Sequence, residues 1–152
     1  YEKFGELRGL EYQKDLEYLS FTAGGRTQAA PAQRLTDFVE GRISADLNPT
    51  SYQPGLNCAP LHSLLPKQIG SRLKHGFTEF GKKMKGYYTS QANIVGVESR
   101  TSSPVNIPRN EQLVHPEIMG LFPCGEGGGY AGGIVSAAMD GERCAEAATS
   151  NY

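Results

Sequence analysis

The feature that most constrains this chain is a glycine-rich stretch near its C-terminal end. Residues 120–147 have the sequence GLFPCGEGGGYAGGIVSAAMDGERCAEA, and six of the nine residues from 125 to 133 are glycine. Glycine has no Cβ atom, so its backbone can adopt positive φ and approach another surface closely. The flanking residues predict a short buried strand over 118–122, then the loop, then a helix over 134–148.

The start of that helix suits an anionic or electron-rich ligand atom, because its first N–H groups are unbonded and carry partial positive charge. The spacing Gly127-x-Gly129-x-x-Gly132 matches the dinucleotide fingerprint, but that motif needs a second strand and an acidic residue about 20 positions later. Only 20 residues follow Gly132, so the match is interpreted as a coincidence of composition. The phosphate loop of nucleotide hydrolases is excluded because no Gly-Lys-Ser/Thr follows. Two interpretations stay open: a turn without a ligand, and a loop that completes a cofactor site built mainly elsewhere.

Composition narrows the class of protein. The chain has 152 residues, with 15 basic and 16 acidic side chains and a net charge of −1, which argues against a nucleic-acid binder or a polybasic membrane protein. No apolar run approaches the ~20 residues of a membrane span. The three cysteines, at positions 58, 124 and 144, suit neither a disulfide framework nor a zinc site, so a cytoplasmic location and no metal are expected. The chain begins at Tyr1 and not at Met, so we expect a fragment of a longer protein.

Apolar periodicity and turn residues predict an α+β fragment that is richer in helix than in strand. The predicted helices span residues 10–23, 31–41, 66–85 and 134–148, the predicted extended segments span 87–98, 102–108 and 118–122, and a long loop spans 42–66. Pro31 is expected at the first turn of its helix. The 66–85 helix is expected at the centre of the core. Its basic residues could form an anion-binding face, but a solvated helix surface is the preferred interpretation.

Four motifs occur in an order that resembles a known family: APAQRLTDFVEG, SYQPG, ESRTSSPVNIPR and GLFPCGEGGGYAGGIVSAAMDG. Over about residues 10–147 the chain resembles the C-terminal part of bacterial FAD-dependent (FAD/NAD-utilising) dehydrogenases. The family pattern has Ala, Thr and Arg where this chain has Gly128, Ser99 and Asn106. The resemblance implies FAD as cofactor, with its pyrophosphate-binding fingerprint upstream, and it leaves NAD(P) open for the parent protein.

The resemblance also implies a domain organisation. Residues 1–98 would belong to an inserted domain over the flavin, residues 99–117 would cross between domains, and residues 118–152 would close a Rossmann-like FAD-binding domain. The last strand would have lost its parent sheet in the fragment. It would then pair within the fragment or with another copy, because an unpaired apolar edge invites association.

Site residues follow from the same resemblance. Glu126 would bind the ribityl or pyrophosphate part of FAD, unless it is a solvent-facing loop charge, and Tyr130 would pack beside the ring or fill a domain interface. Arg100 would offer a cation to substrate or cofactor, or form a salt bridge with Glu98 or another carboxylate, and Thr101 would add a hydroxyl donor. The complete expected cofactor-binding set is Gly125, Glu126, Gly127, Gly129, Tyr130, Gly132, Gly133, Ile134, Arg100 and Thr101.

The resulting hypothesis is the C-terminal portion of an FAD-dependent oxidoreductase acting on an unidentified small molecule. Its partner would be the rest of the FAD-binding domain, and no catalytic residue can be named. The alternative is a non-catalytic docking module. Cys124 is expected to be a small buried hydrophobe and not a redox thiol. The three histidines have no metal-like spacing, and His75 is expected at the surface.

Overall fold

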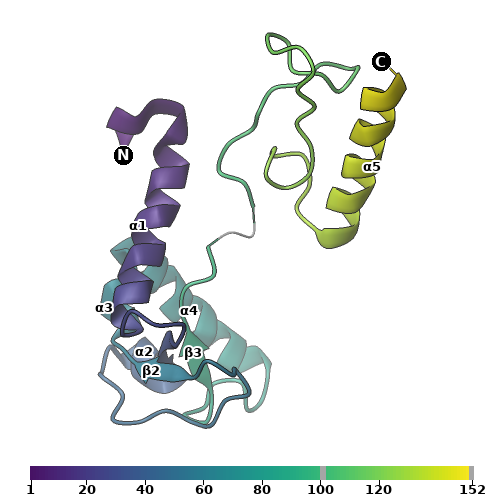
Figure 1. Cartoon of the computed structure of the whole chain (residues 1–152). Helices are drawn as coiled ribbons and strands as arrows, with labels where there is room; N and C mark the ends of the chain where they lie inside the picture. The colour runs from purple at the N-terminus through teal and green to yellow at the C-terminus, as the bar shows by residue number, and fades with distance from the viewer. Residues whose placement is uncertain (100–101, 151–152) are drawn as a thin grey trace. The chain divides into compact units, whose positions relative to one another are not determined.

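The computed structural model describes residues 1–99 and 102–150, and within them the chain is an α+β protein with a three-stranded mixed sheet and five α-helices (Figure 1). It divides into two compact units: unit 1 comprises Tyr1–Lys14 and Ser99–Tyr152, and unit 2 comprises Asp15–Glu98. The elements are a 3-10 helix η1 (Glu2–Leu7), α1 (Arg8–Ala23), β1 (Ala30–Arg34), α2 (Leu35–Glu40), β2 (Leu56–Cys58), α3 (Leu61–Leu64), α4 (Lys67–Lys83), β3 (Asn93–Val95) and α5 (Ile134–Ser150).

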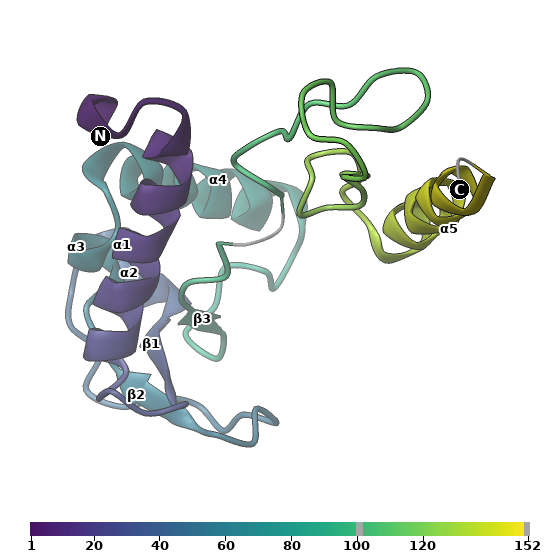
Figure 2. The ribbon, with the colours of Figure 1, turned by 45° about the horizontal axis from the view of Figure 1, so that its top comes forward.

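The sheet of unit 2 has the order β2-β1-β3 (Figure 2). Strand β1 pairs in parallel with β2, with Ala30 opposite Leu56, and antiparallel with β3, with Ala32 opposite Val95. Its three middle residues are buried, and both α2 and α3 contact it. The central strand is therefore the element around which unit 2 is organised.

The apolar core of unit 2 gathers on and beside β1. Phe38 of α2 is fully buried, and its ring meets that of Phe77 edge-on at a centroid distance of 5.9 Å. Helix α2 ends at Gly41, whose φ of 74° is the left-handed conformation that glycine adopts without strain. The buried apolar residues of this unit are Leu16, Ala32, Leu35, Phe38, Ala59 and Leu61.

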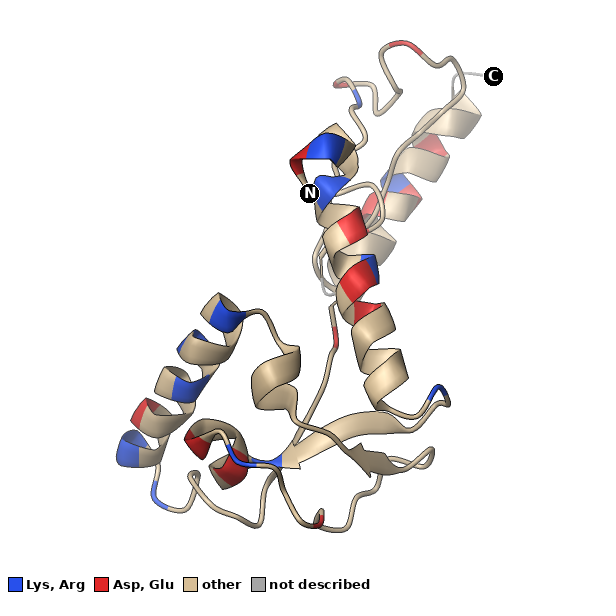
Figure 3. Ribbon diagram, turned by 90° about the vertical axis from the view of Figure 1, so that its left-hand side faces the viewer, with Lys and Arg blue, Asp and Glu red and all other residues tan. Residues whose placement is uncertain are grey.

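Helix α4 confirms the helix predicted over 66–85, but it does not lie at the centre of the core. Its apolar residues Ile69, Leu73 and Phe80 remain 36–47% exposed, and Gly70 is its one buried residue. Figure 3 marks Lys and Arg positions in blue along this helix, and His75 is exposed as expected. The core forms on β1 instead, because that strand is covered on both edges and by two helices.

Pro31 marks the clearest error of the sequence-based prediction. It lies inside β1, opposite Asn57 of β2, and the helix begins four residues later at Leu35. The Pro31 carbonyl accepts a hydrogen bond from Gly96 N at 3.0 Å. Tertiary pairing thus decides the conformation of this segment, although proline is unusual in a central strand.

The helices predicted over 10–23 and 134–148 are confirmed as α1 and α5, and the 87–98 strand is confirmed in its centre as β3. The segment predicted as a loop over 42–66 contains β2 and α3 in addition to turns. No strand forms over 102–108 or 118–122 among the described residues of unit 1. The extended prediction for 118–122 is wrong: Ile118 and Met119 are 53% and 92% exposed.

Candidate functional site

The glycine-rich loop of unit 1 folds into a compact turn ahead of α5. The Gly129 N–H donates to Glu126 O at 2.9 Å, and the Tyr130 N–H donates to Gly125 O at 3.0 Å. Gly125 and Gly129 have φ of 66° and 83°, which explains why these two positions require glycine. The loop is tied to the preceding segment because the Ile107 N–H donates to Gly128 O at 3.1 Å.

The loop glycines divide into a packed set and an open set. A Cβ atom on Gly128 would lie 3.0 Å from Cys124 O, and one on Gly129 would lie 2.8 Å from Val105 O. A Cβ atom on Gly127 or Gly132 would meet no atom within 4 Å. Gly127 and Gly132 are therefore the places where backbone faces open space and a ligand could approach closely.

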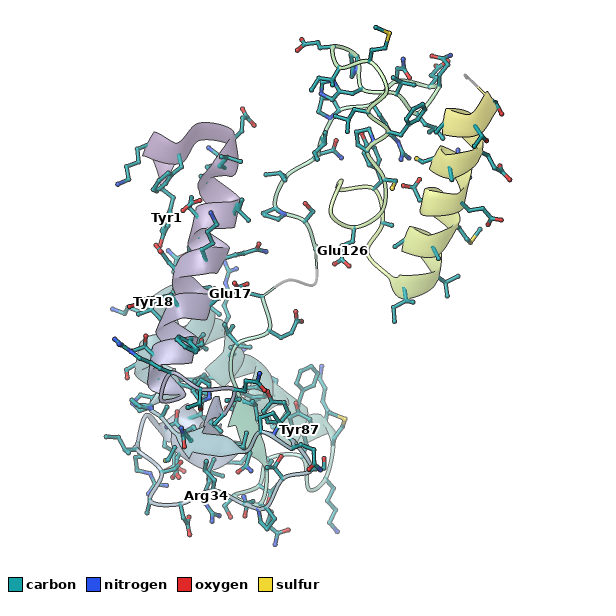
Figure 4. The ribbon with its side chains drawn as sticks, in the orientation of Figure 1. Tyr1, Glu17, Tyr18, Arg34, Tyr87 and Glu126 are labelled. Atoms are coloured by element: carbon teal, nitrogen blue, oxygen red, sulfur yellow. The ribbon has the colours of Figure 1, made fainter. Side chains whose placement is uncertain are left out.

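Glu126 carries an unsatisfied polar atom at this site. Its Oε1 oxygen is buried and has no hydrogen-bond partner in the described part of the chain. Figure 4 shows the Glu126 side chain beside the turn made by the loop. A buried polar atom without a partner costs about 1–3 kcal/mol, so this oxygen is an acceptor available to a donor.

Glu126 and Gly127 border a cavity of about 350 Å³ within unit 1. Leu10 and Gln13 of α1 form part of its wall, and the Gln13 side-chain amide donates to Ser99 O at 2.7 Å. Ser103 Oγ donates to Val105 O at 2.7 Å and to Gly127 O at 3.3 Å. The remaining lining residues are Ser102, Ser103, Pro104 and Val105.

The other predicted site residues lie in different surroundings. The Tyr130 hydroxyl donates to Ile107 O at 2.8 Å, and its ring lies 3.6 Å from the Arg109 guanidinium carbon, so both ends of this side chain have protein partners. Ile134 begins α5 with its side chain 92% exposed, and Gly133 O accepts hydrogen bonds from Ser136 Oγ and Ala137 N. Arg100 and Thr101 lie outside the described residues.

An ion pair that the sequence did not reveal fixes the loop onto α5. Arg109 Nη1 and Nη2 donate to the two Asp140 carboxylate oxygens at 2.9 and 2.7 Å, and each side chain is only 10% exposed. Asp140 also accepts from Gly125 N at 2.9 Å, and Arg109 donates to Pro123 O at 2.9 Å. The hydrogen bonds from Arg109 and Gly125 lower the pKa of Asp140 to about 2, and the same pair raises the pKa of Arg109.

The sequence pattern gives only a weak sign of this pair. Arg109 follows a proline in an irregular segment, and Asp140 stands among the small residues of α5, 31 positions away. A carboxylate at an inward position of a helix of small residues is the one available signal, since a buried charge needs a partner. The pair positions the loop and does not line the cavity.

The three cysteines and His62 lie in different surroundings. Cys58 and Cys124 are exposed and Cys144 is buried, so the expectation of a buried Cys124 is wrong, because the buried strand predicted before it does not form. In unit 2, His62 Nδ1 lies 2.8 Å from the Gln33 side-chain nitrogen, and burial together with Lys74 lowers the pKa of His62. Across the described ranges, no group of His, Cys, Asp and Glu could hold a metal ion, and no helix has the length and apolarity to cross a membrane.

Comparison with known proteins assigns the chain to a family through residues that precede the glycine-rich loop. Residues 1–101 match the family described as FAD-dependent protein, C-terminal domain-like. An uncharacterized protein from Clostridium beijerinckii is 44% identical over 142 residues, which cover 92% of this chain and 27% of that protein. The chain thus spans about a quarter of the length of this relative. The resemblance to the C-terminal part of an FAD-dependent family is confirmed, and the chain belongs to the FAD-dependent protein C-terminal-domain-like family.

Proposed function

We propose that this chain is the C-terminal portion of an FAD-dependent oxidoreductase and that its glycine-rich loop completes the flavin site. The observation that carries the proposal is the buried Glu126 Oε1, which has no partner among the described residues and borders a cavity. The family supports FAD as the cofactor of the full-length protein. The dehydrogenase reaction, the substrate and any use of NAD(P) remain predictions.

The loop residues fit a hydroxyl-bearing part of the cofactor. A carboxylate oxygen accepts hydrogen bonds from hydroxyl groups, and FAD carries several along its ribityl chain. Glu126 would bind those hydroxyls, and the open backbone at Gly127 would let them approach. Satisfying Oε1 would recover the free energy that its burial costs.

The start of α5 fits a second part of the cofactor. Unbonded N–H groups in the first turn of a helix carry partial positive charge, and nothing lies within 4 Å of a Cβ built on Gly132. The amides of Gly132, Gly133 and Ile134 would stabilise negative charge on the pyrimidine edge of the flavin. When bound, FAD supplies hydride and electron transfer, and the protein supplies position, exclusion of water and local electrostatics.

Two observations support the proposed domain organisation. The family match ends at residue 101, and one boundary between the compact units falls between Glu98 and Ser99; the other, between Lys14 and Asp15, places the first 14 residues in unit 1. Residues 1–98 would then belong mainly to the inserted domain. Residues 99–117 would cross back, and residues 118–152 would close the FAD-binding domain. The proposed closing strand would form only against strands of the full-length protein.

The test is the visible absorption spectrum of the full-length protein and its FAD dissociation constant. Glu126→Ala removes a charged acceptor, which is worth about 1.5–3 kcal/mol, so we expect FAD affinity to fall about 10- to 100-fold. Glu126→Gln keeps one carbonyl acceptor and should show a smaller loss. The matched control is Glu117→Gln, an exposed carboxylate of the same unit that does not line the cavity.

A colourless, folded full-length protein that ignores added FAD would refute the proposal. The exposed apolar side chains Ile134 and Val135, at 92% and 72%, would then favour the docking-module alternative. A yellow protein whose FAD affinity is unchanged in Glu126→Ala would keep the flavin and remove Glu126 from its site. Pairing between copies stays a prediction; the described residues form no strand over 118–122 that could mediate it.

A further inference from the structure

Two of the three cysteines lie together beside the Arg109–Asp140 pair. Cys144 Sγ is 3.8 Å from the carbonyl oxygen of Pro123, the residue joined to Cys124, and 3.3 Å from Arg109 Nη1. The Cys124 side chain also contributes to the raised pKa of the Cys144 thiol, which places the two side chains close to each other. Cys124 precedes the loop and Cys144 belongs to α5, so the pair bridges the two elements that form the candidate site.

The two thiols differ in access to solvent. Cys124 is exposed, whereas Cys144 is only 3% exposed. Burial raises the pKa of the Cys144 thiol, although Arg109 opposes the shift, so Cys144 stays protonated at neutral pH. Because the thiolate is the nucleophile and needs access to its target, Cys124 is the thiol that reacts first with a dissolved oxidant.

We infer that Cys124 and Cys144 form an oxidisable dithiol that a hydroperoxide converts into a disulfide. The Cys124 thiolate attacks one oxygen of hydrogen peroxide, the O–O bond breaks, and Cys124 sulfenic acid and, after protonation, water are formed. The Cys144 sulfur then attacks the Cys124 sulfur. An S–S bond forms, and the sulfenic oxygen leaves as a second water with the proton of Cys144. In total two thiols are oxidised and one peroxide is reduced to two waters.

The position of the bond gives it a structural effect. The residue after Cys124 is Gly125, whose N–H donates to Asp140 of α5 at 2.9 Å. A disulfide from Cys124 to Cys144 would add a covalent tie alongside this hydrogen bond. Oxidation would therefore restrict the glycine-rich loop relative to α5. This inference does not depend on the proposed flavin site.

The experiment is disulfide mapping in the full-length protein. The reduced protein is treated with hydrogen peroxide, remaining thiols are blocked with N-ethylmaleimide, and the protein is digested with trypsin. Arg143 separates the two cysteines, so cleavage after Arg109 and Arg143 places Cys124 and Cys144 on different peptides. We expect these two peptides to appear joined, and to separate when a reductant is added.

Two variants test which cysteines form the disulfide. Cys58→Ser should leave the cross-link unchanged, because Cys58 lies in unit 2. Cys144→Ser should stop the reaction at Cys124 sulfenic acid, which dimedone traps. Recovery of both wild-type peptides as N-ethylmaleimide adducts after peroxide treatment would overturn the inference, and so would a cross-link between the Cys124 residues of two copies. The wild-type map decides the question even where a variant fails to fold.

Discussion

Different kinds of interaction stabilise the interior of each of the two compact units. Among the residues that the structure describes, six of the seven buried apolar residues belong to unit 2, whereas Cys144 alone represents unit 1. In unit 1 the order of the glycine-rich loop depends on the Arg109–Asp140 pair and on backbone hydrogen bonds. Unit 2 is therefore stabilised by an apolar core, as small globular domains are. The loop region of unit 1 is stabilised mainly by polar contacts. Polar pairs can hold a loop in place, but they supply little of the apolar burial that drives folding.

We expect the largest effect from a substitution at Phe38 in the core of unit 2. Phe38→Ala empties a fully buried site, so we expect unit 2 to lose about 3–5 kcal/mol of unfolding free energy. Phe80→Ala is the matched control, because Phe80 is 47% exposed and its loss should cost far less. Denaturant titration with hydrogen exchange on peptides of each unit measures both variants. Equal losses in the two variants would contradict the proposed position of the core.

A smaller effect is expected from acid, and it should fall on unit 1. The Asp140 pKa is about 2 in the folded protein against a reference value of 3.8, so the carboxylate stabilises the fold fully above pH ~5. This contribution, about 2 kcal/mol, is lost as the pH falls toward 2. We expect hydrogen exchange, corrected for its intrinsic pH dependence, to rise first in the loop and α5. The Asp140→Asn variant should be less stable than the wild type at neutral pH and should lack this acid-dependent loss of stability. An identical pH profile in that variant would assign the acid effect to another group.

The smallest effect separates the packed glycines from the open ones. Gly129→Ala places a Cβ atom 2.8 Å from Val105 O at a φ of 83°, so we expect a cost of about 1–2 kcal/mol in the stability of the loop. Gly127→Ala meets no atom within 4 Å and should leave stability unchanged. Thermal unfolding of the two variants tests this pair. If Gly127→Ala proves as destabilising as Gly129→Ala, the division between packed and open positions is wrong.

The sequence predicted the elements whose signals are local. Helices α1, α4 and α5 follow from apolar periodicity, and the glycines after α1 and α2 mark their ends. The resemblance points to Glu126, and the structure places its buried Oε1 oxygen beside a cavity, although its cofactor role remains a prediction.

Features that depend on distant partners could not be predicted. Pro31 lies in a strand because β2 and β3 pair with it, and the apolar run at 118–122 finds no partner strand in the described chain. The Arg109–Asp140 pair joins residues 31 positions apart, which periodicity cannot detect. The prediction failed where hydrogen-bond or ion-pair partners lie far along the chain, because local pattern carries no information about them.

Unit 1 is discontinuous in sequence, and this has a consequence for how the chain folds. Its two parts, Tyr1–Lys14 and Ser99–Tyr152, are separated by roughly 80 residues of unit 2. If those residues were a flexible coil, bringing the ends together would cost about 4 kcal/mol of loop-closure entropy. When unit 2 is folded, this loop-closure entropy has already been lost. Gln13 is then held at a high effective concentration near Ser99, to which it donates a hydrogen bond. The stability of the unit 2 core thereby contributes to how often the cavity beside Glu126 is assembled.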